Sequence, residues 1–328
     1  MARELAGLLV DPVDGPYPGV LTLADGVIAG VERQADAPRD VLVFPGFVDL
    51  QVYETAGLAE HGVTGYLLAT RDAGAPLGPR CLGLHLEGPF LNPEAAGAIP
   101  VEEITPVDLA ALDGWLAGGA VRMVTVAPEI EGGLDAIETI AAAGAVASVG
   151  HTRANNATTR AAIDAGARFA THVWNAMGPT RARATGPVPE LLLNPAVTLG
   201  LIPDGRHLHP RIEELTFRVA GAERIALTSD AVVPPAEKPD GSLLGGDCCG
   251  ARLVARMARF GLREAAAMAS LTPARVLGLA DRGRLAPGYR ADLAVLAADF
   301  APLETLSGGE TISAARYAAG EELGRDSS

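Results

Sequence analysis

Four residues that could do hydrolytic chemistry each end a strand-like apolar run. These residues are Glu87, which ends CLGLHLE before a Gly-Pro pair, His151 in VASVGH, His172 in FATH and Asp230 in IALTSD. In a barrel of parallel strands the carboxyl ends gather at one face, where barrel enzymes keep their active sites. A carboxylate and two imidazoles suit one hydrolytic metal ion, and a further aspartate suits the base beside it. We therefore predict one divalent ion, zinc or another metal, held by Glu87, His151 and His172.

The neighbouring residues leave two alternatives open. His85 lies two residues before Glu87, so both side chains face the same side of a strand. We interpret His85 as a residue that fills the barrel or supports a ligand, in preference to a ligand itself. Asp230 could instead cap a following helix, as aspartate often does. Its place at the same mouth as the predicted ligands favours the catalytic base.

The first strand lacks the His-x-His pair with which amidohydrolase-type barrels commonly begin. At that place the chain reads Asp49-Leu50-Gln51-Val52-Tyr53, and neither glutamine nor tyrosine can replace an imidazole at a zinc-like ion. A binuclear site bridged by a carbamylated lysine is also excluded, because Lys238 is the only lysine and follows the last predicted strand. The sequence therefore predicts a single metal ion.

These residues need a scaffold of alternating strands and helices. Eight apolar runs bounded by Gly or Pro alternate with Ala- and Leu-rich stretches of helical character, which predicts an α/β fold, a (β/α)8 TIM-like barrel. Short strands near both chain ends predict a small β-sandwich domain built from residues 1–43 and 284–328, with the barrel over residues 44–283. The eight runs are 41–51, 64–70, 81–87, 121–129, 146–152, 169–175, 197–205 and 223–231.

Composition restricts the partners. A formal net charge of −14 argues against nucleic acid and against anionic membrane surfaces. No uncharged run approaches the about 20 residues that span a bilayer, and the N-terminal segment makes a poor signal peptide. The three cysteines, Cys81, Cys248 and Cys249, form no disulfide framework and fit a reducing compartment. We expect a cytoplasmic protein.

Taken together, the motifs resemble those of the N-acetylglucosamine-6-phosphate deacetylase family of the amidohydrolase superfamily. The matching stretches include LHLEGPFLNP, VGHT, THVWNAM, PDGRHLHP, LTSDA and ASLTPARVLGL. The resemblance implies deacetylation of N-acetylglucosamine 6-phosphate, or a close N-acyl amino-sugar phosphate, with Asp230 as acid/base. It also implies a homodimer in which Arg183 reaches the neighbouring subunit to bind phosphate. The further substrate contacts that it implies are Ala98, Asn175, Ala176, His207 and Gly245.

The chain departs from this family at several positions. Ile99 stands where members usually carry a histidine that polarises the acetyl carbonyl, and Gly246 replaces the last serine of a loop. Cys248 and Cys249 follow in place of an apolar run. Compared with family members, the chain also has fewer residues after the first predicted barrel strand and after Asp230. Loss of one oxyanion donor typically costs about 2.7–4 kcal/mol. Two alternatives therefore stay open: a single-metal amidohydrolase for a different small amide, and a non-catalytic sugar-phosphate-binding paralogue.

Overall fold

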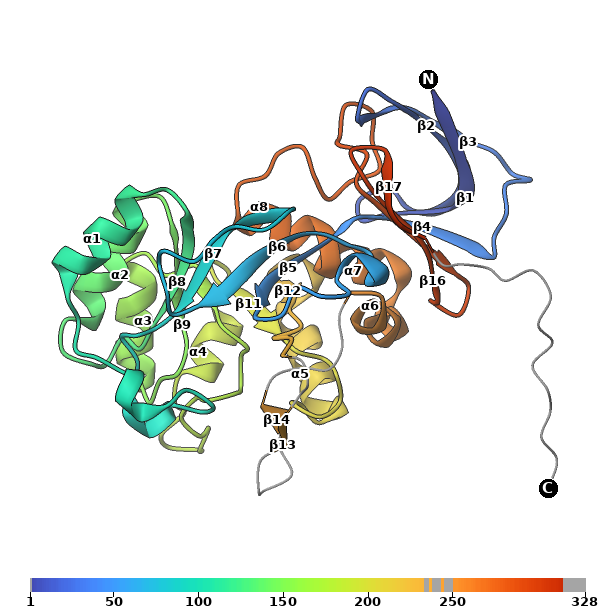
Figure 1. Cartoon of the computed structure of the whole chain (residues 1–328). Helices are drawn as coiled ribbons and strands as arrows, with labels where there is room; N and C mark the ends of the chain where they lie inside the picture. Colours follow the sequence, from blue (N-terminus) through green and yellow to red (C-terminus); the bar gives the residue numbers. More distant parts are fainter. Residues whose placement is uncertain (1, 233–235, 238–242, 245–249, 315–328) are drawn as a thin grey trace, which may run out of the picture.

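The structure is a computed structural model that describes residues 2–232, 236–237, 243–244 and 250–314 (Figure 1). Lys238, Gly245, Gly246 and the Cys248–Cys249 pair therefore lie outside the described residues. Within the described part, no helix is long and apolar enough to cross a membrane.

Eight parallel strands form the barrel, in the order in which they follow one another along the chain. The first and last strands, β5 and β12, are joined just beyond the strand pairing by a parallel bridge between Val52 and Ala231, which closes the ring. All eight strands expected from the sequence are present, so the barrel is confirmed (Figure 1). The strands are β5 (Phe47–Val52), β6 (Val63–Thr70), β7 (Cys81–Glu87), β8 (Val121–Val126), β9 (Val146–Val149), β10 (Phe169–Ala170), β11 (Thr198–Leu201) and β12 (Ile225–Leu227).

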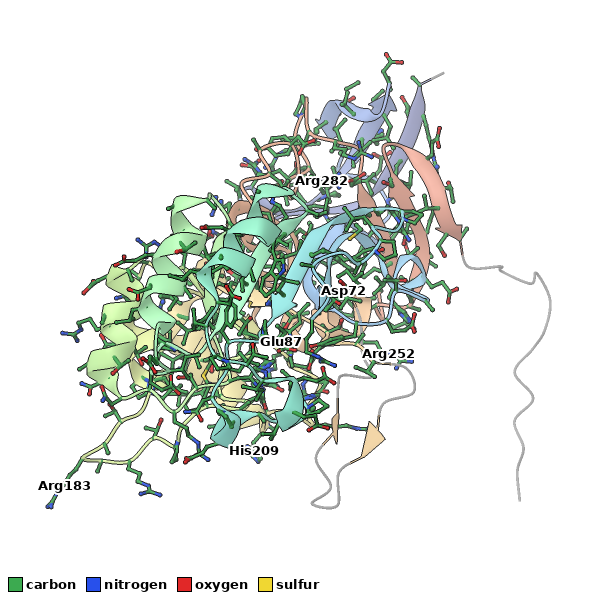
Figure 2. All side chains as sticks on the ribbon, turned by 60° about the vertical axis from the view of Figure 1, so that its left-hand side comes forward. Asp72, Glu87, Arg183, His209, Arg252 and Arg282 are labelled. Atoms are coloured by element: carbon green, nitrogen blue, oxygen red, sulfur yellow. The ribbon has the colours of Figure 1, made fainter. Side chains whose placement is uncertain are left out.

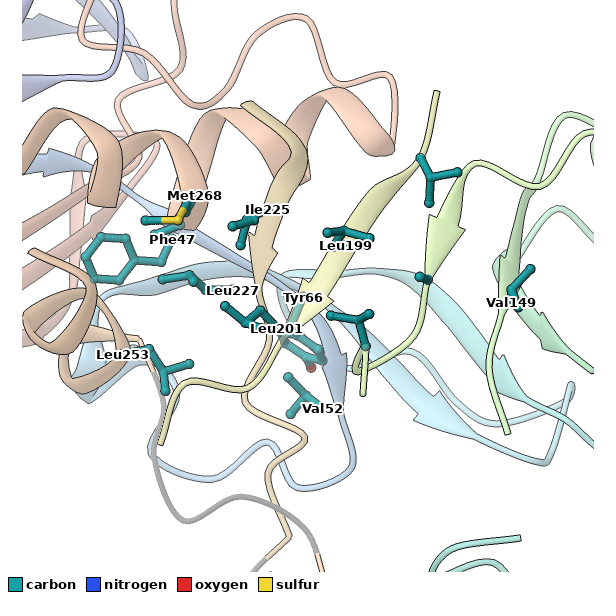
Figure 3. Close-up of a cluster of buried hydrophobic side chains, with 14 of the residues drawn as sticks. Phe47, Val52, Tyr66, Val149, Leu199, Leu201, Ile225, Leu227, Leu253 and Met268 are labelled. Atoms are coloured by element: carbon teal, nitrogen blue, oxygen red, sulfur yellow. The ribbon is translucent and has the colours of Figure 1, made fainter. Parts of the chain in front are cut away.

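The barrel strands are buried because both of their faces are covered. All six residues of β5 are buried, and so are all three residues of β12. Near-continuous apolar runs are typical of parallel strands with a packed layer on each side. Figure 3 shows side chains of this core, among them Val52, Tyr66 and Leu201. This packing fixes the strand ends that carry the candidate site.

Helices cover most, but not all, of the barrel. The described residues contain no α-helix between β5 and β6 or between β6 and β7, where the chain has only a 3-10 turn, η1 (Ala59–His61), and a loop. The α-helices are α1 (Leu109–Ala117), α2 (Gly133–Ala142), α3 (Asn156–Asp164), α4 (Val188–Leu193), α5 (Pro210–Ala220), α6 (Ala251–Met257), α7 (Leu262–Ala266) and α8 (Thr272–Val276). Shorter elements are η2 (Pro93–Ala95), η3 (Val101–Glu103), η4 (Ala222–Arg224), η5 (Ala258–Phe260), the π-helical η6 (Ala267–Leu271), β13 (Ala236–Glu237) and β14 (Leu243–Leu244).

The two chain ends meet in one seven-stranded sheet, as the sequence predicts. Its order is β17-β16-β15-β4-β1-β2-β3, so the three strands from the C-terminal end and the four from the N-terminal end form two blocks that meet where β15 pairs with β4, with no barrel strand between them. The backbone N–H of Ile28 donates to the carbonyl of Tyr289, so the β3 edge bends back toward the segment before β15. Strand β16 contacts both β6 and η1, on the side where the barrel lacks helices. The strands are β1 (Arg3–Asp11), β2 (Gly15–Ala24), β3 (Val27–Arg33), β4 (Val41–Pro45), β15 (Leu293–Ala297), β16 (Pro302–Ser307) and β17 (Glu310–Ala314).

Candidate active site

The four residues predicted to do chemistry stand at the carboxyl ends of their strands. Glu87 is the last residue of β7, whereas His151, His172 and Asp230 each follow their strand by two or three residues. The φ angles of these three residues are 47°, 30° and 50°. This left-handed backbone is uncommon for residues other than glycine and often occurs at functional positions. The chain thus turns away from each strand at the residue whose side chain enters the site.

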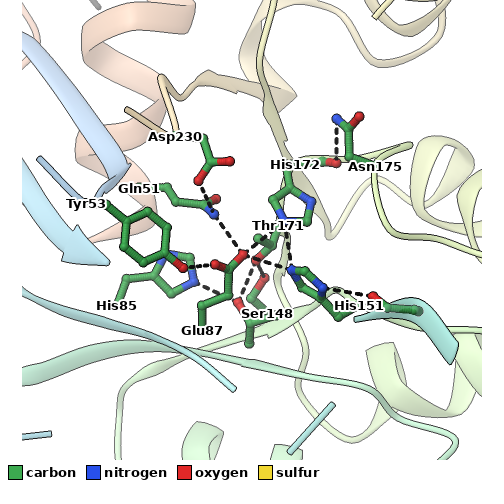
Figure 4. Close-up of polar contacts among 12 residues, drawn as sticks. Gln51, Tyr53, His85, Glu87, Ser148, His151, Thr171, His172, Asn175 and Asp230 are labelled. Atoms are coloured by element: carbon green, nitrogen blue, oxygen red, sulfur yellow. Dashed lines mark hydrogen bonds and ion pairs between the residues drawn. The ribbon is translucent and has the colours of Figure 1, made fainter. Parts of the chain in front are cut away.

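Glu87, His151 and His172 converge on one point (Figure 4). Glu87 Oε1 lies 3.0 Å from His151 Nε2 and 2.9 Å from His172 Nε2, and the two Nε2 atoms are 3.0 Å apart. All three side chains are buried. Among the His, Cys, Asp and Glu residues of the described part, these three form the group whose ligand atoms are close enough together to hold a metal ion.

The donor set fits a divalent cation. His151 Nδ1 lies 3.0 Å from the carbonyl oxygen of Ala95, which can only accept, so this nitrogen carries the hydrogen. The Nε2 lone pair of His151 is then free to bind a metal, an arrangement common among metal-binding histidines. Many catalytic zinc sites have two histidines and one glutamate as protein ligands and keep the fourth position open. The predicted ligand residues are therefore brought together in a form suited to a metal.

The two site carboxylates have opposite pKa shifts. Burial acts to raise the pKa of Glu87, but the hydrogen bonds and charges of His151 and His172 outweigh it and hold this pKa well below its ordinary value. Burial and the negative charge of Glu87 raise the pKa of Asp230 well above its ordinary value. A bound divalent cation would oppose that rise. A ligand that stays ionised and a carboxyl that readily holds a proton suit the predicted roles.

Asp230 does not cap a helix. Its amide N–H donates to the carbonyl of Gln51 at 3.0 Å, and Ala231 next to it bridges to Val52. The described residues directly after it, Ala231 and Val232, are not helical. The capping alternative is therefore wrong, and Asp230 belongs to the ring of strand ends around the ligands.

A row of hydroxyl groups lies in the barrel beneath the ligands. His85 Nδ1 is 2.9 Å from the carbonyl oxygen of Leu50, so Nδ1 donates and Nε2 must accept from Thr125 Oγ1, 2.7 Å away. Thr125 in turn accepts from Thr171 at 2.7 Å, and Thr171 accepts from Ser148 at 2.6 Å. Burial lowers the pKa of His85, which keeps the imidazole neutral as this arrangement requires. His85 thus lies outside the ligand group and links β5 to β8.

Sequence reasoning missed three residues that hold the site. Gln51 Nε2 lies 2.9 Å from Glu87 Oε1 and 3.0 Å from Asp230 Oδ1, and the Tyr53 hydroxyl donates to Glu87 Oε2. Burial, followed by the charge of Glu87, raises the pKa of Tyr53 well above its ordinary value, so the phenol keeps its proton. By residue type neither glutamine nor tyrosine replaces an imidazole at a zinc-like ion, and the sequence alone gives no sign of these hydrogen bonds.

Glu129 is the third residue that the sequence did not reveal. Its Oε1 accepts from Asn92 Nδ2 at 2.8 Å and from the amide of Arg153, while Oε2 accepts from the Thr152 hydroxyl. Glu129 thereby ties the loop after β7 to the residues that follow His151. The Ala-Pro-Glu sequence after the β8 run was the available signal, because it places a carboxylate at another strand end.

The predicted substrate residues lie at different distances from the ligands. A Cβ atom at Gly97 would be 3.3 Å from Ala176 Cβ and 3.3 Å from His151 Cε1, so the loop that carries Ala98 packs against both residues. Asn175 Nδ2 donates to the carbonyl of His172 at 3.3 Å. These contacts bring Ala98, Asn175 and Ala176 near the ligand group.

Two further predicted contacts, His207 and Arg183, lie in loops that follow β11 and β10, and a third lies outside the described residues. His207 Nδ1 lies 2.7 Å from Asp204 Oδ2, in the loop after β11. Arg183 is exposed on a loop that extends away from Glu87 (Figure 2), so its part in a neighbouring subunit stays a prediction. Gly245 is the residue that the structure does not describe.

Comparison with known proteins decides the family. The amidohydrolase family matches residues 125–306 of this chain. An Escherichia coli O157:H7 protein named N-acetylgalactosamine-6-phosphate deacetylase is 33% identical, covering 84% of this chain and 90% of its own. The bovine N-acetylglucosamine-6-phosphate deacetylase is 30% identical, with 80% and 82% covered. The chain belongs to the N-acetylglucosamine-6-phosphate deacetylase family of amidohydrolases.

The solved structures agree with this assignment. The Thermotoga maritima N-acetylglucosamine-6-phosphate deacetylase superposes with a TM-score of 0.86 at 27% identity, covering 96% of this chain and all of the other. As a member of this family, the protein is a hydrolase that acts on an amide C–N bond.

Proposed function

We propose that this deacetylase-family protein hydrolyses N-acetylglucosamine 6-phosphate, or a close N-acyl amino-sugar phosphate, to the amino-sugar phosphate and acetate. The observation that carries the proposal is the convergence of Glu87, His151 and His172 on one point with Asp230 beside them. Gln51 hydrogen-bonds to both carboxylates, at 2.9 Å and 3.0 Å, and so joins the ligand group to the acid/base.

The roles of the residues follow from their chemistry. A divalent cation held by Glu87, His151 and His172 would, when bound, lower the pKa of water and polarise the acyl carbonyl. Asp230 accepts a proton from the attacking water while the oxygen of that water bonds to the acyl carbon. The C–N bond then breaks, and Asp230 returns the proton to the leaving amine nitrogen. Its raised pKa suits a group that must hold this proton between the two steps.

Substrate binding is assigned from the family resemblance together with the positions of the residues. Ala98, Asn175 and Ala176 would line the site close to the ligands, His207 and Gly245 would bind the sugar phosphate, and Arg183 would bind phosphate in a partner subunit. Ile99, which is 6% exposed, supplies no side-chain donor to the acyl oxygen.

Four further properties belong to the same proposal. We assign zinc as the metal, since two histidines and a glutamate are favoured zinc ligands. We assign a homodimer because Arg183 needs a partner subunit in order to act. We assign a cytoplasmic location, because three cysteines that form no disulfide framework fit a reducing compartment. Residues 1–43 with 284–328 and residues 44–283 are assigned as two domains.

Acetate release tests the proposal directly. The panel contains N-acetylglucosamine 6-phosphate, its galactosamine epimer and unphosphorylated N-acetylglucosamine, with metal content measured on the same sample. We expect turnover of a phosphorylated member and a turnover about 10²–10⁴-fold lower by Asp230→Asn. Turnover of a different amide alone would favour the first alternative, whereas binding of sugar phosphate without turnover of any compound would favour the non-catalytic paralogue.

A further inference from the structure

Asp204 and His207 form a buried pair in the loop after β11. The side chain of Asp204 has no exposed surface, and that of His207 is 8% exposed. Oδ2 of Asp204 lies 2.7 Å from Nδ1 of His207. An ionised carboxylate can only accept, so Nδ1 carries a hydrogen and donates it. Within the described residues Nε2 of His207 has no hydrogen-bond partner, and it is therefore the atom left for a ligand.

The loop holds the Asp204 carboxylate in one orientation. Its Oδ1 atom accepts from the amide N–H groups of Arg206 and His207, both at 2.8 Å. Burial acts to raise the pKa of Asp204, but the hydrogen bonds from His207 and from the two amides outweigh it and lower this pKa, so the carboxylate is ionised. At Gly205, with a φ of 79°, an added Cβ atom would come within 2.7 Å of the Arg256 guanidinium. The turn thus packs against α6 and presents Oδ2 to His207.

The pair lies on the catalytic face of the barrel. The loop begins after β11 ends at Leu201, at the same end of the barrel as the metal-ligand candidates. Burial is the largest of the causes that raise the pKa of Asp230, and the negative charge of Asp204 is another. The influence of one charge on another falls with distance, so Asp204 is near the acid/base. A ligand at His207 would therefore lie beside the reacting groups.

His207 differs from two other buried histidines in the partner of its Nδ1 atom. In His85 and His151 this nitrogen faces the carbonyl oxygens of Leu50 and Ala95, which are neutral acceptors. A neutral acceptor is sufficient to fix a neutral imidazole. An ionised carboxylate at Nδ1 also stabilises the imidazolium that forms when Nε2 takes a second proton from solvent, and Nε2 then donates as a charged N–H.

A charged N–H donor suits a phosphate ester, which carries a charge of about −1.5 to −2 at pH 7. We propose that Asp204 is a positioning residue for substrate phosphate: it orients His207 so that Nε2–H meets the phosphate, and it balances the charge of the imidazolium. The proposal rests on the proposed function, because it takes an amino-sugar phosphate as the ligand of His207.

Binding of glucosamine 6-phosphate to the zinc-loaded protein tests the role of Asp204. In Asp204→Asn the amide oxygen can keep both backbone N–H groups, which turns the NH₂ group toward Nδ1 of His207. Because this NH₂ group can only donate, Nδ1 must accept, and the imidazolium is excluded. The affinity measured by calorimetry should fall about 10–100-fold, the usual contribution of a hydrogen bond between charged groups. Wild-type affinity in Asp204→Asn would overturn the proposal.

Asp299→Asn is the matched control. Oδ1 of Asp299 accepts from the amide N–H of Ala301 at 3.0 Å, which makes a similar turn between β15 and β16. This variant should bind glucosamine 6-phosphate like the wild type. Thermal unfolding of both variants checks that the fold is kept. An equal loss of affinity in the two variants would show a general effect of removing such a carboxylate, and the proposal would fall.

Nitrogen NMR of the imidazole supplies a readout that a merely structural role of Asp204 would not move. In the wild-type complex with glucosamine 6-phosphate, both ring nitrogens of His207 should carry hydrogen, whereas in Asp204→Asn only Nε2 should. The variant His207→Gln assigns the signals. A wild-type complex in which Nε2 carries no hydrogen would overturn the proposal, because Nε2 would then accept from a sugar hydroxyl.

The two measurements use no turnover and so separate this proposal from the proposed function. Binding without hydrolysis, lost in Asp204→Asn, would support the role of Asp204 and contradict the deacetylase. Hydrolysis by the wild type with the same KM in Asp204→Asn would overturn the role of Asp204 alone. If both proposals hold, Asp204→Asn should raise KM about 10–100-fold and change kcat far less. A wild type that does not bind glucosamine 6-phosphate would overturn both.

Discussion

The Nδ1 atom of His151 lies 3.0 Å from the carbonyl oxygen of Ala95. This contact joins a metal-ligand candidate after β9 to the loop after β7, four residues before Ile99. The orientation of the imidazole and the path of that loop are therefore coupled. A change in the loop is expected to act on the metal site as well as on the substrate.

Ile99→His should restore a donor to the acyl oxygen in the transition state. A well-placed donor is worth about 2.7–4 kcal/mol, but Ile99 is buried at 6% exposure and Pro100 restrains the loop, so we expect a smaller gain. The measurement is kcat and KM on N-acetylglucosamine 6-phosphate, with Ile99→Leu as a control of similar volume and no donor. A rise in kcat with little change in KM is expected. No gain, combined with efficient wild-type turnover of another amide, would mean that the site serves a different substrate.

Asp230→Asn should lower kcat by about 10²–10⁴, the usual contribution of general acid–base catalysis. The amide oxygen of asparagine can still accept from Gln51, so the geometry and the metal content should be retained. Steady-state kinetics and elemental analysis on one preparation check both statements. Near-wild-type turnover would require a different base.

Removal of the metal should lower the thermal stability of the protein. A ligand present at about 100 times its Kd stabilises the folded state by about 2.7 kcal/mol, so zinc should raise the Tm of chelator-treated protein. His172→Ala should abolish this rise. His209→Ala serves as a control, because the exposed His209 ring accepts, among the described residues, only from the amide N–H of Arg211 at the start of α5. An equal zinc response in wild type and His172→Ala would refute the ligand assignment.

Thr125→Val should destabilise the fold by about 1–3 kcal/mol. The valine keeps the shape but leaves His85 Nε2 and the Thr171 hydroxyl without their partner in a buried site. Urea unfolding of the metal-free protein measures the change. Thr139→Val on α2 should change stability far less, because the Thr139 hydroxyl donates to the carbonyl of Asp135 and to no other group in the described part of the chain. Equal effects of the two substitutions would contradict the directed hydroxyl row.

Asp49 should make stability depend on pH. Burial raises the pKa of Asp49 from 3.8 to about 6, although the amide N–H groups of Gln51 and Ser229 donate to it and act to lower the pKa. The folded state then holds a proton that the unfolded chain has lost, so stability falls as pH rises between about 4 and 6. The total is about 3 kcal/mol, from about two pKa units.

The neutral variant Asp49→Asn isolates this contribution. Relative to wild type, Asp49→Asn should gain stability as pH increases through that window, as measured by urea unfolding of metal-free protein. A stability difference between the two proteins that stays constant with pH would show that Asp49 does not titrate there.

The sequence was sufficient for the barrel and for the ligand group because both depend on local patterns. Each of Glu87, His151 and His172 ends an apolar run, and parallel strands bring such ends together whatever the loops do. The exact extent of the strands was less accessible. The run that carries His172 reads as seven residues, yet β10 has two, because the positive φ angles at His172, Trp174 and Ala176 end the strand early.

The supporting contacts could not be predicted, for a physical reason. Gln51 reaches Asp230 only because the barrel closes between β5 and β12, a pairing between residues 179 positions apart. The direction of the hydroxyl row depends on which atom of His85 faces the Leu50 carbonyl. Neither contact can be predicted from the residue spacing within a single strand, because each joins residues of different strands.

The left-handed backbone at His151, His172 and Asp230 bears on how such a chain would change under mutation. A residue other than glycine in this conformation costs about 1 kcal/mol relative to ordinary backbone. Glycine at any of the three would relieve this backbone strain, but it would also add conformational freedom to the unfolded chain and remove a side chain that enters the site. The backbone cost is thus tied to these three side chains, and a substitution that removed the cost would remove the chemistry with it.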